Sequence, residues 1–205
     1  MKKFISLLFV FLITPLYVQA DGQTDAALLK EKLSLFSQIN ADFSQVVTSP
    51  EGKVLNESWG KLMISRPGKF RWQVITPEEE LIVSDGKTMW LYSPFIEQVT
   101  LINLSDAIEG TPFVLLSGAS EKQWATYSVK KEDNKFTVKN ADLRLQGNTF
   151  IFEFNRADNI SKFVVIEEQG QQSEFKLSHK PQTTTLDSSF FDFKIPLGVE
   201  IDDQR

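Results

Sequence analysis

Residues 66–99 read RPGKFRWQVITPEEELIVSDGKTMWLYSPFIEQV, and this stretch carries most of the information about the fold. Phe70, Trp72 and Val74 alternate with polar side chains, and this period of two is typical of a half-buried strand. Asp85-Gly86 separates two apolar runs, which is the strongest short signal for a β-hairpin. The stretch therefore predicts consecutive antiparallel strands joined by short turns.

The same pattern extends to both sides of this stretch. Apolar side chains alternate in residues 43–47, 62–66 and 150–154, and further turn pairs are Glu51-Gly52, Asp133-Asn134, Gly147-Asn148, Asp158-Asn159 and Gln169-Gly170. Successive hairpins of this kind form an antiparallel meander that curls into a barrel or half-barrel. The predicted fold is mainly β, of the α+β class, with one domain over residues 21–205.

Helical patterns are confined to short segments. Apolar side chains at i, i+4 and i+7 predict an amphipathic helix that begins at Thr24 or Asp25, with the apolar face Leu29, Leu33 and Phe36. A second, short helix is predicted over residues 113–116, between Thr111-Pro112 and Gly118. These two segments are the candidates for covering the sheet.

The first 20 residues have the pattern of a cleaved secretory signal peptide. Lys2 and Lys3 precede an apolar run over residues 4–18, and Ala20 offers a small residue before Asp21. The alternative is a membrane anchor, but the run is shorter than the roughly 20 apolar residues that span a bilayer. Because Asp21 is not a cysteine, the lipid-attachment route of bacterial lipoproteins is closed to the predicted mature chain.

Charge and composition argue against several functions. The formal charge of −5 becomes −7 when Lys2 and Lys3 are removed with the signal, since residues 1–20 contain no acid. An acidic chain without a basic block does not fit nucleic-acid binding. The chain has no cysteine and a single histidine, His179, so neither a zinc site nor any other cofactor site is predicted. The sequence does not predict an enzyme, although a hydrolase that uses His179 or an acidic cluster stays an alternative.

Aromatic residues and one arginine suggest a different role. Beyond the signal, the chain keeps 14 of its 17 Phe residues and all 4 Trp residues. A single curved sheet that carries these side chains on one face leaves apolar surface that must meet a lid or a ligand. Arg66 continues the strand face of Leu62 and Ile64, so its guanidinium lies either in water after Pro67 or at a cavity rim. At a rim, its donors could reach the carbonyls of a closing helix.

Several motifs, taken in order, resemble the periplasmic outer-membrane lipoprotein carrier proteins of the LolA family. Besides residues 66–99, they are Phe43-Ser44-Gln45, Thr111-Pro112-Phe113, Pro196-Leu197-Gly198-Val199 and the C-terminal Asp202-Asp203-Gln204-Arg205. The resemblance implies an incomplete antiparallel β-barrel, one curved sheet with a lid of short helices over an apolar cavity. It also implies a monomeric protein of the periplasm, released by cleavage near Ala20-Asp21.

The resemblance further implies a function and residue roles. A member of this family takes lipoproteins from an inner-membrane ABC exporter, shields their acyl chains and passes them to an outer-membrane receptor lipoprotein. Arg66 matches the arginine that holds the lid, and Phe70 lies near the mouth that the exporter uses, so Phe70→Glu is expected to fold but to fail in loading. The residues expected at the cavity or its mouth, in contact with acyl chains or the exporter, are Phe43, Leu62, Ile64, Phe70, Trp72 and Trp90, and the expected lid residues are Leu29, Leu33, Phe36, Phe113 and Leu116. The alternative is a periplasmic lipid-sensing or interaction module of the same fold.

Overall fold

The computed structural model describes residues 24–142, 147–181 and 185–205, so the predicted signal peptide and its cleavage position lie outside the described residues. The helical elements are α1 (Asp25–Ser34), α2 (Leu104–Ile108), α3 (Phe113–Leu116), α4 (Glu121–Trp124) and the 3-10 turn η1 (Ser188–Phe191). The strands are β1 (Gln38–Thr48), β2 (Val54–Ser65), β3 (Lys69–Thr76), β4 (Glu80–Asp85), β5 (Thr88–Ser93), β6 (Gln98–Asn103), β7 (Tyr127–Glu132), β8 (Lys135–Asn140), β9 (Thr149–Phe154), β10 (Ile160–Ile166), β11 (Gln172–His179) and β12 (Glu200–Asp203).

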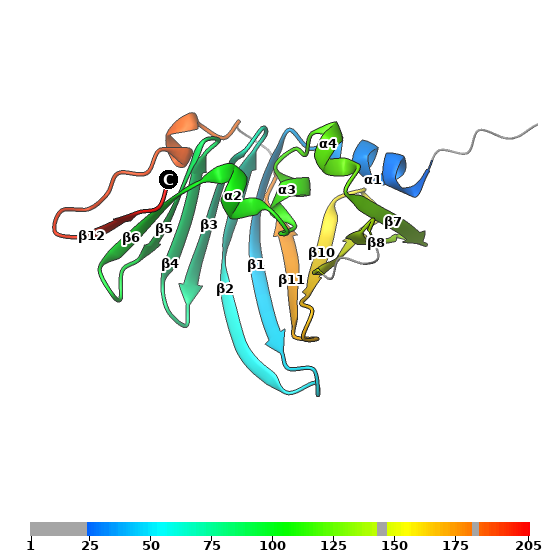
Figure 1. The fold of residues 1–205 in the computed structure, drawn as a ribbon, viewed down its shortest axis with the longest axis horizontal. Helices are drawn as coiled ribbons and strands as arrows, with labels where there is room; N and C mark the ends of the chain where they lie inside the picture. Colours follow the sequence, from blue (N-terminus) through cyan, green and yellow to red (C-terminus); the bar gives the residue numbers. More distant parts are fainter. Residues whose placement is uncertain (1–23, 143–146, 182–184) are drawn as a thin grey trace, which may run out of the picture.

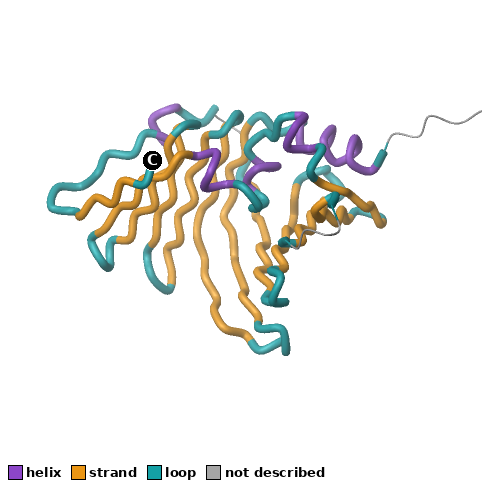
Figure 2. Tube along the Cα trace, in the orientation of Figure 1, coloured by secondary structure: helices purple, strands orange, loops and turns teal. Residues whose placement is uncertain are grey.

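All these strands belong to one open, curved sheet (Figures 1 and 2). Its order is β12-β6-β5-β4-β3-β2-β1-β11-β10-β9-β8-β7, and every neighbouring pair is antiparallel except β12 with β6. Two meanders, β1–β6 and β7–β11, are joined where β1 pairs with β11. The predicted antiparallel half-barrel is therefore confirmed, whereas the parallel edge strand β12 was not predicted.

The main core lies on the face of the sheet that the helices cover. Strand register places Leu62 opposite Trp72 and Ile64 opposite Phe70, with all four side chains buried. On the other meander, the same face carries fully buried phenylalanines that stand in cross-strand register, namely Phe136, Phe152 and Phe163. The helices join the two groups into a single apolar cluster.

A second, smaller core covers the opposite face of β3–β6. Buried Val83, Val99 and Leu101 point to this side, away from the main cluster. The C-terminal segment packs over them, with Phe191 buried and the Phe193 ring 5.6 Å from the Tyr92 ring. This segment lies behind the sheet and so leaves the helical face free of the chain terminus.

Local sequence explains most of the helices. Thr24 caps α1, because its hydroxyl oxygen accepts a hydrogen bond of 3.2 Å from the backbone N–H of Ala27. Ser120 and Gln123 form a reciprocal capping box at α4. Gly118, at φ +106°, follows α3 in the left-handed region, where a glycine is favoured over other residues. Within the described residues, no helix is long and apolar enough to cross a membrane.

Candidate functional site: a lid helix over an apolar cavity

Arg66 ties the short helix α3, which is the predicted lid, to the sheet. It follows the last residue of β2, and its Nε donates a hydrogen bond of 2.8 Å to the carbonyl oxygen of Leu116. Its Nη2 donates a second hydrogen bond, of 3.3 Å, to the carbonyl oxygen of Leu115. Burial lowers the pKa of Arg66, because the charged form loses hydration. The guanidinium thus satisfies backbone acceptors at the helix end, which α3 itself leaves unpaired.

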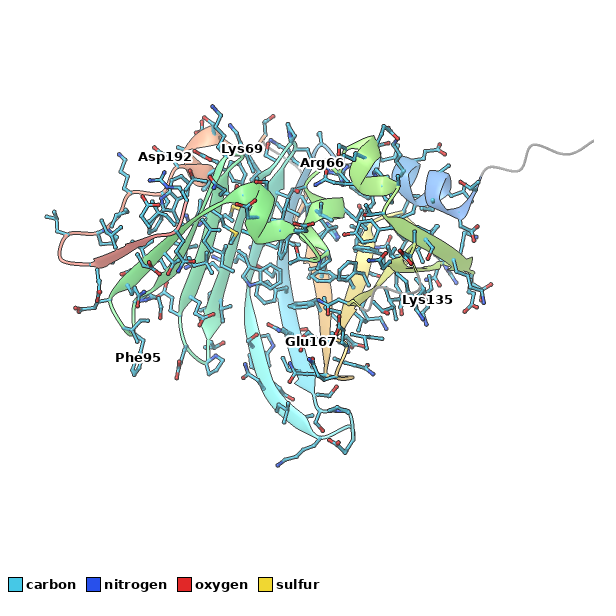
Figure 3. All side chains as sticks on the ribbon, viewed as in Figure 1. Arg66, Lys69, Phe95, Lys135, Glu167 and Asp192 are labelled. Carbon is cyan, nitrogen blue, oxygen red and sulfur yellow. The ribbon has the colours of Figure 1, made fainter. Side chains whose placement is uncertain are left out.

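Two further contacts hold the segment after Arg66 against α3. The backbone N–H of Gly68 donates to the carbonyl oxygen of Ser117 at 2.9 Å. The carbonyl oxygen of Gly68 in turn accepts a 2.9 Å hydrogen bond from the buried hydroxyl of Ser84 on β4. Arg66 lies beside α3 and α4 at one end of the sheet (Figure 3). The β2–β3 turn and α3 therefore form one hydrogen-bonded unit.

Aromatic rings fill the space beneath α3. Phe70 stacks on Phe113 of the helix with ring centroids 5.0 Å apart. Trp72 meets the same Phe113 edge to face at 5.6 Å and stacks on Phe43 at 4.0 Å. Such contacts are worth about 0.5–1.5 kcal/mol each beyond the burial of area. The lid is therefore held by apolar packing as well as by Arg66.

A cavity of about 290 Å³, which is open to solvent on one side, remains beside these rings. None of the described residues that line it is charged, and they are Gln45, Trp72, Ile82, Thr111, Pro112, Phe113, Asn148, Phe163, Val165, Ser173 and Phe175. Two other hollows, of about 240 and 510 Å³, include Glu80 in one case and Glu109 with Asp142 in the other. An uncharged, aromatic lining suits an apolar ligand better than these acidic hollows do.

Comparison with known proteins agrees with this geometry. Residues 34–194 match the family model of the outer membrane lipoprotein carrier protein LolA. The chain belongs to the LolA family. The outer-membrane lipoprotein carrier protein of Psychromonas ingrahamii is 62% identical over 205 residues and that of Aeromonas salmonicida is 43% identical over 205 residues, with all of each chain covered.

A solved structure supports the fold alone. An uncharacterized conserved protein from Thermus thermophilus superposes with a TM-score of 0.52 at 12% identity. The match covers 88% of this chain and 100% of the other. The curved sheet with a few short helices is thus shared well beyond recognisable sequence similarity.

The residues that the LolA resemblance assigned to the cavity do not all line it. Trp72 does, whereas Phe43, Leu62, Ile64 and Phe70 are buried on the same face of the sheet, packed against other side chains. Phe70 is only 1% exposed beneath Phe113, so a partner reaches it only when α3 moves. The space between α3 and the sheet is largely filled by side chains in this arrangement.

Trp90 was wrongly placed among the cavity residues. In strand register it pairs with Val83 and Leu101, on the outer face of the sheet. Its ring lies 6.3 Å from that of Phe193 in the C-terminal segment. The strand pattern fixes which residues share a face, but the preceding residue, Met89, is the one that faces the main core.

The predicted lid residues are brought together over the main core. Leu29 and Leu33 of α1 are fully buried, Phe36 packs against the same cluster after the helix ends, and Leu116 of α3 is buried in that cluster. Ion pairs fasten α1 at its exposed side, from Lys30 to Glu121 of α4 and from Lys32 to Asp158 before β10. The predicted lid thus consists of separate helices, α1 and α3, with separate attachments.

Sequence reasoning missed helix α2 and part of the cavity wall. Leu104 and Ile108 of α2 are both buried, and their i, i+4 spacing was a readable signal. Gln45 also lines the cavity, although the sequence had predicted for it only a place on the strand face of Phe43 and in a motif. His179 has a structural contact, with Nε2 2.7 Å from the carbonyl oxygen of Ile160. Among the described residues, no group of three His, Cys, Asp or Glu side chains forms a metal site.

Proposed function

We propose that this chain is a periplasmic lipoprotein carrier and chaperone, and not an enzyme. It takes lipoproteins from an inner-membrane ABC exporter, shields their acyl chains beneath α3 and hands them to an outer-membrane receptor lipoprotein. The observation that supports this most directly is the uncharged aromatic cavity under a helix that Arg66 holds by two hydrogen bonds. Membership of the LolA family supports the same role.

The physical chemistry of acyl chains explains why a carrier is needed. Exposure of a chain to water costs about 0.8 kcal/mol per CH₂ group, which sums to the order of 10 kcal/mol for one chain. A lipoprotein therefore does not cross an aqueous compartment by free diffusion. Binding in an apolar cavity gives the acyl chains an apolar environment in place of the membrane that they leave. The lipoprotein can then be carried through water and transferred.

Release requires that the carrier does not hold its cargo too tightly. The sequence contains no phosphate-binding loop, so ATP is not predicted to act on this protein directly. A lid that closes the empty cavity provides an alternative, because opening it costs free energy and lowers the net affinity for the acyl chains. The hydrogen bonds from Arg66 and the rings around Phe113 contribute to that cost.

A release assay tests the proposal. Proteoliposomes that hold the ABC exporter and a triacylated lipoprotein are supplied with ATP and the mature protein, residues 21–205. We expect a soluble one-to-one complex of lipoprotein and carrier that depends on both ATP and the carrier. Transfer of the lipoprotein from that complex to membranes that contain the receptor lipoprotein completes the test.

One control variant and one negative outcome separate the carrier from its alternatives. His179→Asn is expected to release lipoproteins normally, because the His179 ring only contacts a backbone carbonyl, whereas a hydrolase that depends on His179 would lose its activity. Absence of release by the folded protein would contradict the carrier role and favour a lipid-sensing or interaction module of the same fold.

A further inference from the structure

Two hydrogen-bond donors in the cavity have no acceptor within the described part of the chain. One is the indole N–H of Trp72, a side chain that is 7% exposed and whose recorded contacts are with aromatic rings. The other is the side-chain NH₂ of Gln45. No fully buried side-chain nitrogen or oxygen of the described residues lacks a partner, so both donors keep some contact with solvent-accessible space, and both residues line the cavity.

Gln45 is held in a defined orientation. The hydroxyl of Ser58, which is 2% exposed, donates a hydrogen bond of 2.9 Å to Oε1 of Gln45 from the neighbouring strand. In this orientation the amide oxygen accepts from Ser58, and the NH₂ group is left for another acceptor. Phe43 lies two residues before Gln45 on the same face and stacks on Trp72, which brings the two donors to the same part of the sheet.

An apolar cavity with two free donors selects a particular chemistry. A hydrocarbon alone leaves both donors without a partner, and this costs free energy when the ligand excludes water. An anion lacks a positively charged partner among the described lining residues. An uncharged carbonyl oxygen at the end of an apolar chain satisfies the donors while the chain contacts the rings around it.

We propose that Trp72 and Gln45 bind the ester carbonyls through which acyl chains are joined to an uncharged glyceryl group. This proposal rests on the proposed function and adds what the cavity recognises, namely the ester linkage as well as the hydrocarbon. The lipid-modified terminus of a lipoprotein presents such esters without a charged headgroup, whereas a phospholipid presents the same esters beside a phosphate.

The test compares three ligands that carry two eight-carbon chains. These are 1,2-dioctanoylglycerol, its diether analogue without carbonyls, and dioctanoyl phosphatidylglycerol. Each is titrated against the mature protein with a bound fluorescent apolar dye, at concentrations below those at which the lipids aggregate. We expect the ester to displace the dye at about 25-fold lower concentration than the ether, since each of the two net hydrogen bonds is worth about fivefold. The anionic lipid is expected to bind more weakly than the uncharged ester.

Matched variants assign the effect to the two donors. Gln45→Leu and Trp72→Phe keep apolar bulk but remove the donors, so each is expected to reduce the preference for ester over ether, and the double variant to abolish it. Gln73→Leu is the control, because Gln73 lies on the outer face and bonds to Glu79. Circular dichroism checks that each variant is folded, and Gln45→Leu alone keeps the test valid should Trp72→Phe not fold.

Each outcome has a defined meaning. Equal binding of ester and ether by the unaltered protein, or an ester preference that persists in the double variant, overturns the proposal while the carrier function stands. Equal binding of the anionic lipid overturns the assignment to an uncharged headgroup. Failure of all three ligands to displace the dye contradicts the acyl-binding cavity itself, and with it the proposed function.

Discussion

Arg66 and Leu116 are joined by a hydrogen bond of 2.8 Å that links the end of β2 to the last residue of α3. The acceptor is a backbone carbonyl, so the contact depends on the position of the helix and not on which side chains it carries. The same guanidinium reaches the carbonyl of Leu115 at 3.3 Å. One side chain thereby couples the position of α3 to the sheet beneath it.

Replacement of this arginine is predicted to alter release more than loading. Arg66→Leu leaves two carbonyls of α3 without their donors and weakens closure by about 1–3 kcal/mol. The empty cavity then opens more readily, so the variant is expected to accept lipoprotein at least as well as the unaltered protein but to transfer it poorly to the receptor. Quantifying soluble complex and transferred lipoprotein in the same reaction measures both steps.

Two further arginine variants control this experiment. Arg66→Lys keeps the positive charge but loses the planar arrangement of donors, so an intermediate transfer defect is expected. Arg71→Leu removes an arginine from the outer face of β3 and is expected to transfer normally. Normal transfer by Arg66→Leu would show that the hydrogen bonds to α3 do not govern release.

The burial of Phe70 changes what a charged replacement reports. Phe70 is 1% exposed beneath Phe113, so the carboxylate of Phe70→Glu has to be buried or has to displace α3. We expect its free energy of unfolding to fall by about 3 kcal/mol or more, measured by denaturation in urea. The sequence alone predicted that this variant folds and fails only in loading. A loading defect of Phe70→Glu could therefore also result from disturbed packing of α3 on the sheet.

Two companion variants separate packing from contact with the exporter. Phe95→Glu places the same charge at a side chain that is 80% exposed (Figure 3) and is expected to change stability by no more than about 0.5 kcal/mol. Phe70→Leu stays apolar, so a loading defect in that folded variant would support a direct role of the aromatic ring. Unaltered stability of Phe70→Glu would contradict the closed packing of α3 on the sheet.

Gly60 is predicted to be a position where a single methyl group disturbs the cavity wall. A Cβ atom there would lie 1.9 Å from the carbonyl oxygen of Gln73 and 2.7 Å from the ring of Phe43. Gly60→Ala is therefore expected to cost about 3 kcal/mol, through distortion of the β2–β3 pairing and displacement of a ring that stacks on Trp72. Thermal unfolding of the purified variant measures the loss.

Gly52→Ala is the matched control for this prediction. No atom lies within 4 Å of a Cβ at Gly52, so only the backbone conformation at φ +83° opposes the substitution. The expected cost is about 1–2 kcal/mol, which is the usual penalty of the left-handed region for a residue with a Cβ. A cost at Gly60 no greater than that at Gly52 would contradict the close approach of Phe43 to the strand.

Much of the fold follows from short-range patterns in the sequence. The period of two placed Phe70 and Trp72 on one face, and the pairs Asp85-Gly86 and Gln169-Gly170 marked turns between paired strands. The cap at Thr24 and the stop at Gly118 are local effects of the same kind. Such features depend on neighbouring residues alone, which is why a single sequence suffices to predict them.

Other features depend on contacts between residues that are far apart along the chain, and local sequence patterns do not predict these contacts. The alternation of residues shows which side chains share a face with Trp90, but it does not show whether that face points to the cavity or away from it. The C-terminal segment that covers Trp90 is about 100 residues away along the chain. The parallel pairing of β12 with β6 arises in the same way. The extent to which the interior is filled is also a property of packing, because it depends on how Phe113 and the lid meet the sheet.

Residue-specific quenching of tryptophan fluorescence tests the central claim, that acyl chains lie beneath α3. The chain has four tryptophans, so variants that keep only Trp72 or only Trp90 place one probe in the cavity and one on the outer face. Each variant is loaded with a lipoprotein whose acyl chains carry bromine, which quenches only at close range. The account predicts strong quenching of Trp72 and unchanged emission from Trp90. Formation of the loaded complex without quenching of Trp72, or with equal quenching of Trp90, would contradict it.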